Sequence, residues 1–206
     1  FNVILFLSIV LFLIVFFIIK EKDVLINLIL LFAIYLIVQT LFDFYENFKN
    51  RKINFSRIVS HFGFGSLIFF ISINHIFSVE DNFNIKPGEE KNIRGYIVKF
   101  ENLSTSSTDN YKSVIGNFEI LNKEKKIKQN LKPEIRFYNQ PQTITYEASI
   151  KSNFFSDTYL TMSNISDTKI FNIKFQNKPF MNFIWFSVIL ISFGGVLSFF
   201  DRKKIV

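Results

Sequence analysis

Four apolar stretches alternate with polar ones along the chain. The first, Val3 to Ile19, contains a single polar residue, Ser8, and is just long enough to cross a hydrocarbon core of roughly 30 Å. Three further stretches of the same character cover residues 24–42, 58–77 and 180–200. We therefore expect four transmembrane helices, with residues 20–23 joining the first two into an antiparallel hairpin.

A cleaved signal peptide is the alternative for the first stretch. Its apolar run is longer than the roughly 7–15 residues of a signal core, no basic segment precedes it, and no small-residue cleavage site follows. We therefore predict a membrane helix. The chain begins at Phe1 inside this run, which leads us to expect a fragment or a processed product.

The polar segment between the third and fourth stretches is predicted to be rich in β-strands. Phe171, Ile173 and Phe175 alternate with polar residues, as in a half-buried strand. Shorter runs with strand character are separated by turn-rich stretches; they cover residues 93–101, 112–121, 134–139, 143–150 and 157–163. This spacing predicts a small β-sandwich or barrel. The charged run Lys123–Lys126 is expected to be a solvated hairpin tip.

Charge placement predicts the topology. Residues 80–177 carry 14 Lys/Arg and 12 Asp/Glu, a net +2, so 7 − 2 = +5 of the total +7 lies in the membrane part. The link 43–57 and the C-terminal tail are basic, and the positive-inside rule places both in the cytoplasm. Residues 80–177 are then periplasmic in a bacterium. A nearly neutral external domain also argues against nucleic-acid binding.

Composition narrows the chemistry further. The chain has 206 residues, of which 29 are Phe and only 20% are charged. We attribute the apolar excess to membrane spans, with coding bias favouring Phe and Ile. The absence of Cys excludes disulfides, thiolate metal sites and a cysteine nucleophile.

Both histidines, His61 and His75, lie in the third apolar stretch. Fourteen helical residues separate them by roughly 21 Å, too far to ligate one metal ion. An ionisable side chain inside a membrane helix is a candidate functional residue, and His61 lies deeper than His75. Gly63 and Gly65 beside it allow either a flat macrocycle or another helix to approach closely. The local pattern leaves open a haem ligand and a histidine hydrogen-bonded between helices.

The polar segment offers few catalytic candidates. No GxSxG, HExxH, Walker or dinucleotide-binding motif occurs there. Glu134, Glu147 and Asp157 are carboxylates without a partner of suitable spacing, and we interpret them as surface or turn residues.

Three blocks of sequence, in order, resemble the CcmF-type cytochrome c maturation proteins, a family of haem-handling membrane proteins. The first block is Ser60-His61-Phe62-Gly63, similar to the family's His-x-Gly on a late membrane span. The second comprises residues 133–138, 146–150 and 157–160. The third comprises residues 177–180, Ile184-Trp185, Gly194-Gly195 and Asp201-Arg202. The resemblance covers the C-terminal third of such a protein. Ile135 and Tyr146 depart from the family's usual Lys and Thr.

The resemblance implies that His61 is an axial ligand of a b-type haem, with the iron's second ligand on an earlier helix. It implies a subunit or fragment of a haem lyase that attaches haem to the CxxCH cysteines of apocytochrome c through thioethers. This fragment alone is not expected to be active. The implied partners are haem, apocytochrome c, a haem chaperone and thiol-handling subunits.

We therefore expect a mostly α-helical membrane protein of the bacterial inner membrane. Its β-rich domain, residues 80–177, is inserted between the third and fourth of four transmembrane helices, so that residues 1–79 and 178–206 form the membrane part. The alternative is a non-catalytic scaffold whose external β domain docks other assembly proteins. A transporter subunit is less favoured, because the spans carry few charges and no pair of broken helices.

Overall fold

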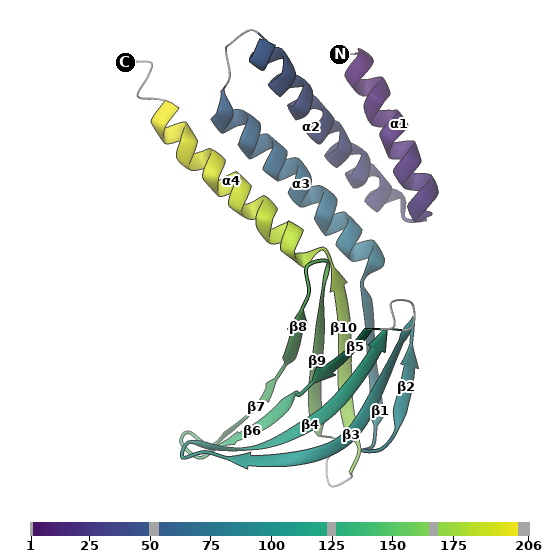
Figure 1. Ribbon diagram of the computed structural model, residues 1–206, viewed down its shortest axis with the longest axis vertical. Helices are drawn as coiled ribbons and strands as arrows, with labels where there is room; N and C mark the ends of the chain where they lie inside the picture. The colour runs from purple at the N-terminus through teal and green to yellow at the C-terminus, as the bar shows by residue number, and fades with distance from the viewer. Residues whose placement is uncertain (1, 50–53, 123–126, 165–168, 202–206) are drawn as a thin grey trace. The chain divides into compact units, whose positions relative to one another are not determined.

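The computed structural model describes residues 2–49, 54–122, 127–164 and 169–201. The chain divides into two compact units (Figure 1). One is formed by the chain up to Phe77 and from Pro179 onwards, and the other by Ser78–Lys178. The first unit is helical and the second consists mainly of strands.

Four helices occur among the described residues: α1 (Asn2–Ile19), α2 (Val24–Lys49), α3 (Phe55–Phe77) and α4 (Met181–Asp201). By length and composition, three of them, α2, α3 and α4, are able to cross a membrane. α1 is apolar from Val3 to Ile19 and is slightly shorter than these. The helical unit therefore fits a membrane protein.

The expected link over residues 43–57 is largely helical, because α2 continues to Lys49 and α3 already begins at Phe55. No Gly or Pro interrupts residues 43–49, and Lys49 lies at the helix C-terminus, where the macrodipole favours a cation. Asp43 forms a solvated ion pair with Arg57 of α3 at 3.4 Å. Of the basic residues expected here, Arg51 and Lys52 lie outside the described residues, as do Arg202, Lys203 and Lys204 of the tail.

The helices pack as a row in which each contacts the next (Figure 1). α3 lies between α2 and α4 and packs against both. The contact of α3 with α4 includes an aromatic cluster in which the Phe70 ring lies 5.0 Å from that of Phe183 and 6.1 Å from that of Phe180. α3 is therefore fixed on two sides, and the rest of its surface remains exposed.

The second unit contains ten described strands. They are β1 (Val79–Ile85), β2 (Glu90–Ile93), β3 (Tyr96–Ser107), β4 (Tyr111–Asn122), β5 (Ile127–Leu131), β6 (Glu134–Tyr138), β7 (Thr143–Glu147), β8 (Ser149–Ser152), β9 (Ser156–Asn164) and β10 (Phe171–Pro179). β1, β10, β9 and β8 form one sheet, in that order. β2, β3, β4, β6 and β7 form the other, with β5 also paired to β4.

The core of this unit lies between the two sheets. The six-stranded sheet contributes Phe100 and Phe118, whose rings stack at 4.2 Å, and the four-stranded sheet contributes Phe171, whose ring meets Phe100 edge-on at 5.7 Å. Along β10, Phe171, Ile173 and Phe175 are buried as the alternating pattern predicts. The aromatic residues of this segment therefore fill the space between two sheets.

β1 and β5 were not expected from the sequence, and β2 was expected only at Ile93. The single run expected over residues 143–150 is divided between β7 and β8, which belong to different sheets. β1 has apolar residues only at Val79, Phe83 and Ile85, and β2 has only Ile93. Each pairs with a more apolar strand, β1 with β10 and β2 with β3. In β1 the apolar residues Val79, Phe83 and Ile85 share one face, but Asp81 interrupts it, so pairing with β10 is needed to identify the strand. The hairpin tip expected at Lys123–Lys126 lies outside the described residues.

Candidate functional site

His61 lies in the second turn of α3. The helix begins after Asn54, whose side-chain Oδ1 accepts a hydrogen bond from the Arg57 amide at 3.0 Å. Asn is a favoured residue at this capping position. The helix thus begins three residues earlier than the apolar pattern indicated, which places His61 farther from the helix end.

The imidazole of His61 is exposed on the face of α3 that contacts neither α2 nor α4. Helical periodicity gathers His61, Phe64, Ile71 and His75 into one exposed stripe, with Ile68 half-buried between them. Within the described residues, His61 makes no hydrogen bond or ion pair. The His61 imidazole is therefore exposed on an otherwise apolar face of α3.

Gly63 and Gly65 each lie on a side of α3 that packs against a neighbouring helix. A Cβ built on Gly63 would lie 3.0 Å from Ile191 and Leu190 of α4, and one on Gly65 would lie 2.9 Å from Ile37 of α2. Both distances are shorter than ordinary van der Waals contact, so each glycine permits close helix packing. Of the two roles expected for these glycines, the geometry matches helix packing.

His75 occupies the other end of the same stripe. Fourteen residues of helix place it roughly 21 Å from His61, so the two imidazoles are too far apart to ligate one ion. Among the described residues, no group of three or more His, Asp or Glu side chains is arranged to hold a metal ion. Among the described residues, His61 and His75 are therefore two separate imidazoles rather than parts of one site.

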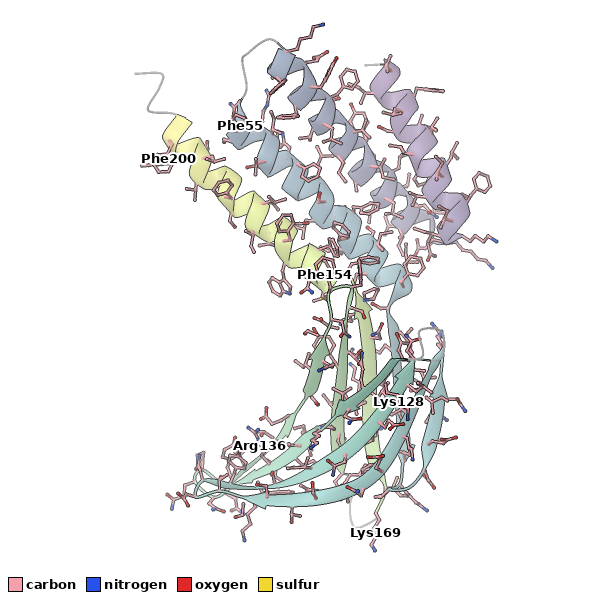
Figure 2. The ribbon with its side chains drawn as sticks, in the orientation of Figure 1. Phe55, Lys128, Arg136, Phe154, Lys169 and Phe200 are labelled. Carbon is pink, nitrogen blue, oxygen red and sulfur yellow. The ribbon has the colours of Figure 1, made fainter. Side chains whose placement is uncertain are left out.

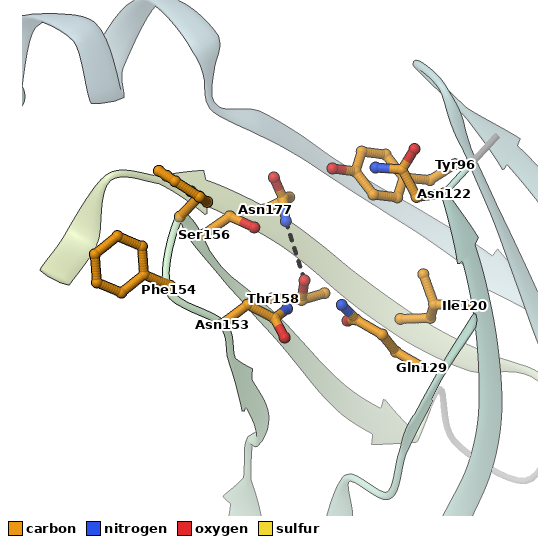
Figure 3. A pocket seen from close by; sticks show the side chains of 10 residues that line it. Tyr96, Ile120, Asn122, Gln129, Asn153, Phe154, Ser156, Thr158 and Asn177 are labelled. Atoms are coloured by element: carbon orange, nitrogen blue, oxygen red, sulfur yellow. Dashed lines mark hydrogen bonds between the residues drawn. The ribbon is translucent and has the colours of Figure 1, made fainter. Parts of the chain in front are cut away.

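The strand domain holds a separate, neutral pocket with a cavity volume of about 170 Å³ (Figure 3). It lies where β3, β4 and β5 face β9 and β10, and its polar lining residues are Tyr96, Asn122, Gln129, Asn153, Ser156, Thr158 and Asn177. Asn177 Nδ2 donates to Thr158 Oγ1 at 3.0 Å, while Gln129 Oε1 is buried and has no hydrogen-bond partner among the described residues. The pocket has no carboxylate, imidazole or amine in its lining, so it is suited to holding water rather than to acid–base catalysis.

The three carboxylates noted in the sequence have structural partners. Glu134 Oε2 accepts from Arg136 Nε at 2.9 Å, which raises the pKa of the guanidinium, and Arg136 also lies over the Tyr111 ring (Figure 2). Glu147 accepts from Thr145 at 2.9 Å. Each of these hydrogen bonds joins residues of a single strand, Glu134 with Arg136 in β6 and Glu147 with Thr145 in β7.

Asp157 was expected at a surface or turn and is instead buried within β9. Its Oδ2 accepts from the Tyr159 hydroxyl at 3.2 Å, and its Oδ1 has no partner among the described residues. Burial is the main cause of a raised Tyr159 pKa, and the neighbouring carboxylate adds to it. β9 lies between β10 and β8, and the face that carries Asp157 is also half-buried at Tyr159 and Thr161, which the local sequence does not show.

A family model described as the CcmF C-terminal beta-sandwich matches residues 76–179, which include every strand of the domain. The chain belongs to the CcmF family. The cytochrome c-type biogenesis protein CcmF of Pseudomonas fluorescens is 28% identical over 145 residues, which are 70% of this chain and 22% of that protein. CcmF of Haemophilus influenzae is 26% identical over 156 residues, which are 75% of this chain and 24% of that protein.

A solved CcmF structure has the same fold. The structure named cytochrome c haem lyase CcmF matches 95% of this chain and 34% of its own chain, with a TM-score of 0.65 and 15% identity. The probable cytochrome c-type biogenesis protein NrfE of Escherichia coli is a more distant relative, 24% identical over 156 residues, which are 76% of this chain and 28% of that protein. The chain thus spans about a quarter of the curated CcmF proteins that it matches.

Proposed function

We propose that this chain is part of a cytochrome c haem lyase and that His61 is an axial ligand of a b-type haem in the membrane. The observation that carries this proposal is the exposed His61 imidazole on an otherwise apolar face of α3. A neutral imidazole is a suitable donor to haem iron, and Phe64 beside it offers apolar surface to a macrocycle. When bound, the haem supplies one-electron transfer that helps to keep an incoming haem reduced.

The residues around His61 hold the imidazole and its surroundings in place. Close packing at Gly63 against α4 and at Gly65 against α2 fixes the rotation of α3, so that His61 faces away from both neighbours. Phe64 and Ile68 occupy the next turns of that face and make it apolar beside the imidazole. We propose that the second ligand is supplied by an earlier helix, as the resemblance to the CcmF family implies, because His75 is too far along α3.

The remaining expectations follow from the same assignment. We place the protein in the bacterial inner membrane, with residues 80–177 in the periplasm and the C-terminus in the cytoplasm. Apocytochrome c, a haem chaperone and thiol-handling subunits are its proposed partners, and the covalent product is a haem thioether on the cytochrome. Membership of a family whose members are named cytochrome c-type biogenesis proteins supports this assignment.

The test compares His61→Gly with His75→Gly in protein purified in detergent together with the remainder of the haem lyase. We expect a b-type haem spectrum that His61→Gly abolishes and His75→Gly leaves unchanged, since both histidines lie on the same face but only His61 lies deep in the helix. Added imidazole should restore the spectrum of His61→Gly, which distinguishes a lost ligand from lost folding.

Equal haem content in the two variants would overturn the ligand assignment. If the intact protein binds no haem while its strand domain captures other assembly proteins, the chain is instead a non-catalytic scaffold.

A further inference from the structure

Apart from the two histidines, Arg57 is the only ionisable residue of α3, and it lies on the same exposed stripe as His61. Four residues of helix, about 6 Å of rise and slightly more than one turn, separate the two. Side chains on a helix lean toward its N-terminus, so the His61 imidazole lies over the turn that Arg57 begins. The guanidinium of Arg57 is therefore the fixed charge of α3 nearest to a group held at His61.

A carboxylate of α2 holds the Arg57 guanidinium without saturating it. Arg57 Nη2 lies 3.4 Å from Asp43 Oδ2, and Asp43 Oδ1 accepts a hydrogen bond from Gln39 Nε2 at 3.3 Å. Within the described residues, the Arg57 side chain makes no other hydrogen bond or ion pair, and it is 48% exposed. Because a guanidinium has five N–H donors, Arg57 retains donors for a second carboxylate.

The haem proposed for His61 carries two propionate carboxylates at the edge of an otherwise apolar macrocycle. A carboxylate beside apolar side chains is unfavourable unless it is paired with a cation. Along the stripe, Arg57 lies on one side of His61, and Phe64 and Ile68 lie on the other. The stripe thus has one cationic end and one apolar stretch, which complement the charge distribution of haem.

We propose that Arg57 pairs with a propionate of the haem that His61 ligates, and that Asp43 orients the guanidinium. This inference rests on the proposed haem ligation by His61 and adds the residue that recognises the carboxylates. A planar guanidinium binds a carboxylate through two parallel hydrogen bonds, a geometry that a Lys ammonium does not provide. Arg57 is then a positioning residue, because a single bond from His61 to the iron leaves the macrocycle free to rotate about that bond.

The experiment compares haem with haem dimethyl ester, in which both carboxylates are blocked while the iron and the macrocycle are retained. The full chain is purified in detergent with the remainder of the haem lyase, stripped of haem and titrated with each compound, and the absorption spectrum reports binding. Wild type should bind haem roughly tenfold more tightly than the ester, as expected for a charge-assisted hydrogen bond. Arg57→Gln should bind the two compounds about equally, with an unchanged spectrum of the bound haem.

Two further variants separate recognition of the carboxylate from other effects. Arg57→Lys should keep part of the preference, because it retains the charge but not the planar fork. Lys49→Gln is the matched control, since it removes an exposed cation from the end of α2 that leads into α3. This control should keep the preference of wild type.

An equal loss of preference in Lys49→Gln and Arg57→Gln would reveal a general surface potential and overturn the pairing. The pairing would also be wrong if wild type bound haem and its ester with equal affinity while His61→Gly still abolished the spectrum. Failure of wild type to bind either compound would instead overturn the proposed haem ligation by His61.

Discussion

Gly194 of α4 lies directly against Ser60 of α3, and a Cβ on Gly194 would collide with the Ser60 hydroxyl and lie 2.7 Å from the Ser60 amide nitrogen. Ser60 and Gly194 belong to the first and third blocks that resemble the CcmF family. These distant blocks meet at the interface between α3 and α4. The contact also lies one residue before His61, so it helps to set the direction in which the imidazole faces.

We predict that Gly194→Ala destabilises the helical unit by about 1–3 kcal/mol, because the new methyl group meets the backbone of Ser60 and Ser56 rather than a flexible side chain. Gly195→Ala is the matched control, since a Cβ there has no atom within 4 Å among the described residues. Thermal unfolding in detergent measures both. Equal melting temperatures for the two variants would show that the close contact between Gly194 and Ser60 does not contribute to stability.

Thr158→Val removes the acceptor for the Asn177 side-chain amide in the pocket of the strand domain. We expect a loss of about 1–3 kcal/mol, because a buried donor is left without a partner. Asn177→Leu combined with Thr158→Val should cost less than the sum of the single changes, since the double variant leaves neither group unpaired. A double-mutant cycle by chemical denaturation measures this coupling, and strict additivity would contradict it.

Glu80 of β1 accepts from Lys174 of β10 at 2.7 Å, and this hydrogen bond is the main cause of a lowered Glu80 pKa. A lowered folded-state pKa stabilises the protein above the unfolded-state pKa, and the gain is lost as pH falls through the folded-state value. Wild type should therefore melt slightly above Glu80→Gln at neutral pH and equal it in acid. The difference should shrink in high salt, because both side chains are about half exposed. A constant difference down to pH 2 would exclude the ion pair as its source.

Tyr159 should ionise at a pH above the ordinary tyrosine pKa, because burial and the Asp157 carboxylate both disfavour the phenolate. A raised tyrosine pKa contributes stability below the unfolded-state pKa, and that contribution disappears as pH rises through the folded-state value. Ultraviolet difference titration of wild type against Tyr159→Phe isolates this group. Asp157→Asn should lower the pKa of Tyr159, and an unchanged midpoint would show that burial acts alone.

In the strand domain, the local pattern of apolar and polar residues is sufficient to predict some strands and not others. The alternation at Phe171, Ile173 and Phe175 predicts β10, because each apolar residue faces the core in turn. The same reasoning misses β1, whose pairing with β10 supplies the hydrogen bonds that its own composition does not indicate. It also misplaces Asp157, since one strand's sequence does not show that both of its faces are covered.

For the candidate site, the sequence by itself determined the apolar stretches, the choice of His61 and the blocks that resemble the CcmF family, because these depend on residue type and spacing along one helix. Only the tertiary structure decided which way those residues point. Gly63 packs against α4, Gly65 against α2, and His61 remains exposed between them. These directions depend on how helices that are far apart in sequence pack together, and the sequence of one helix does not specify which helices pack against it.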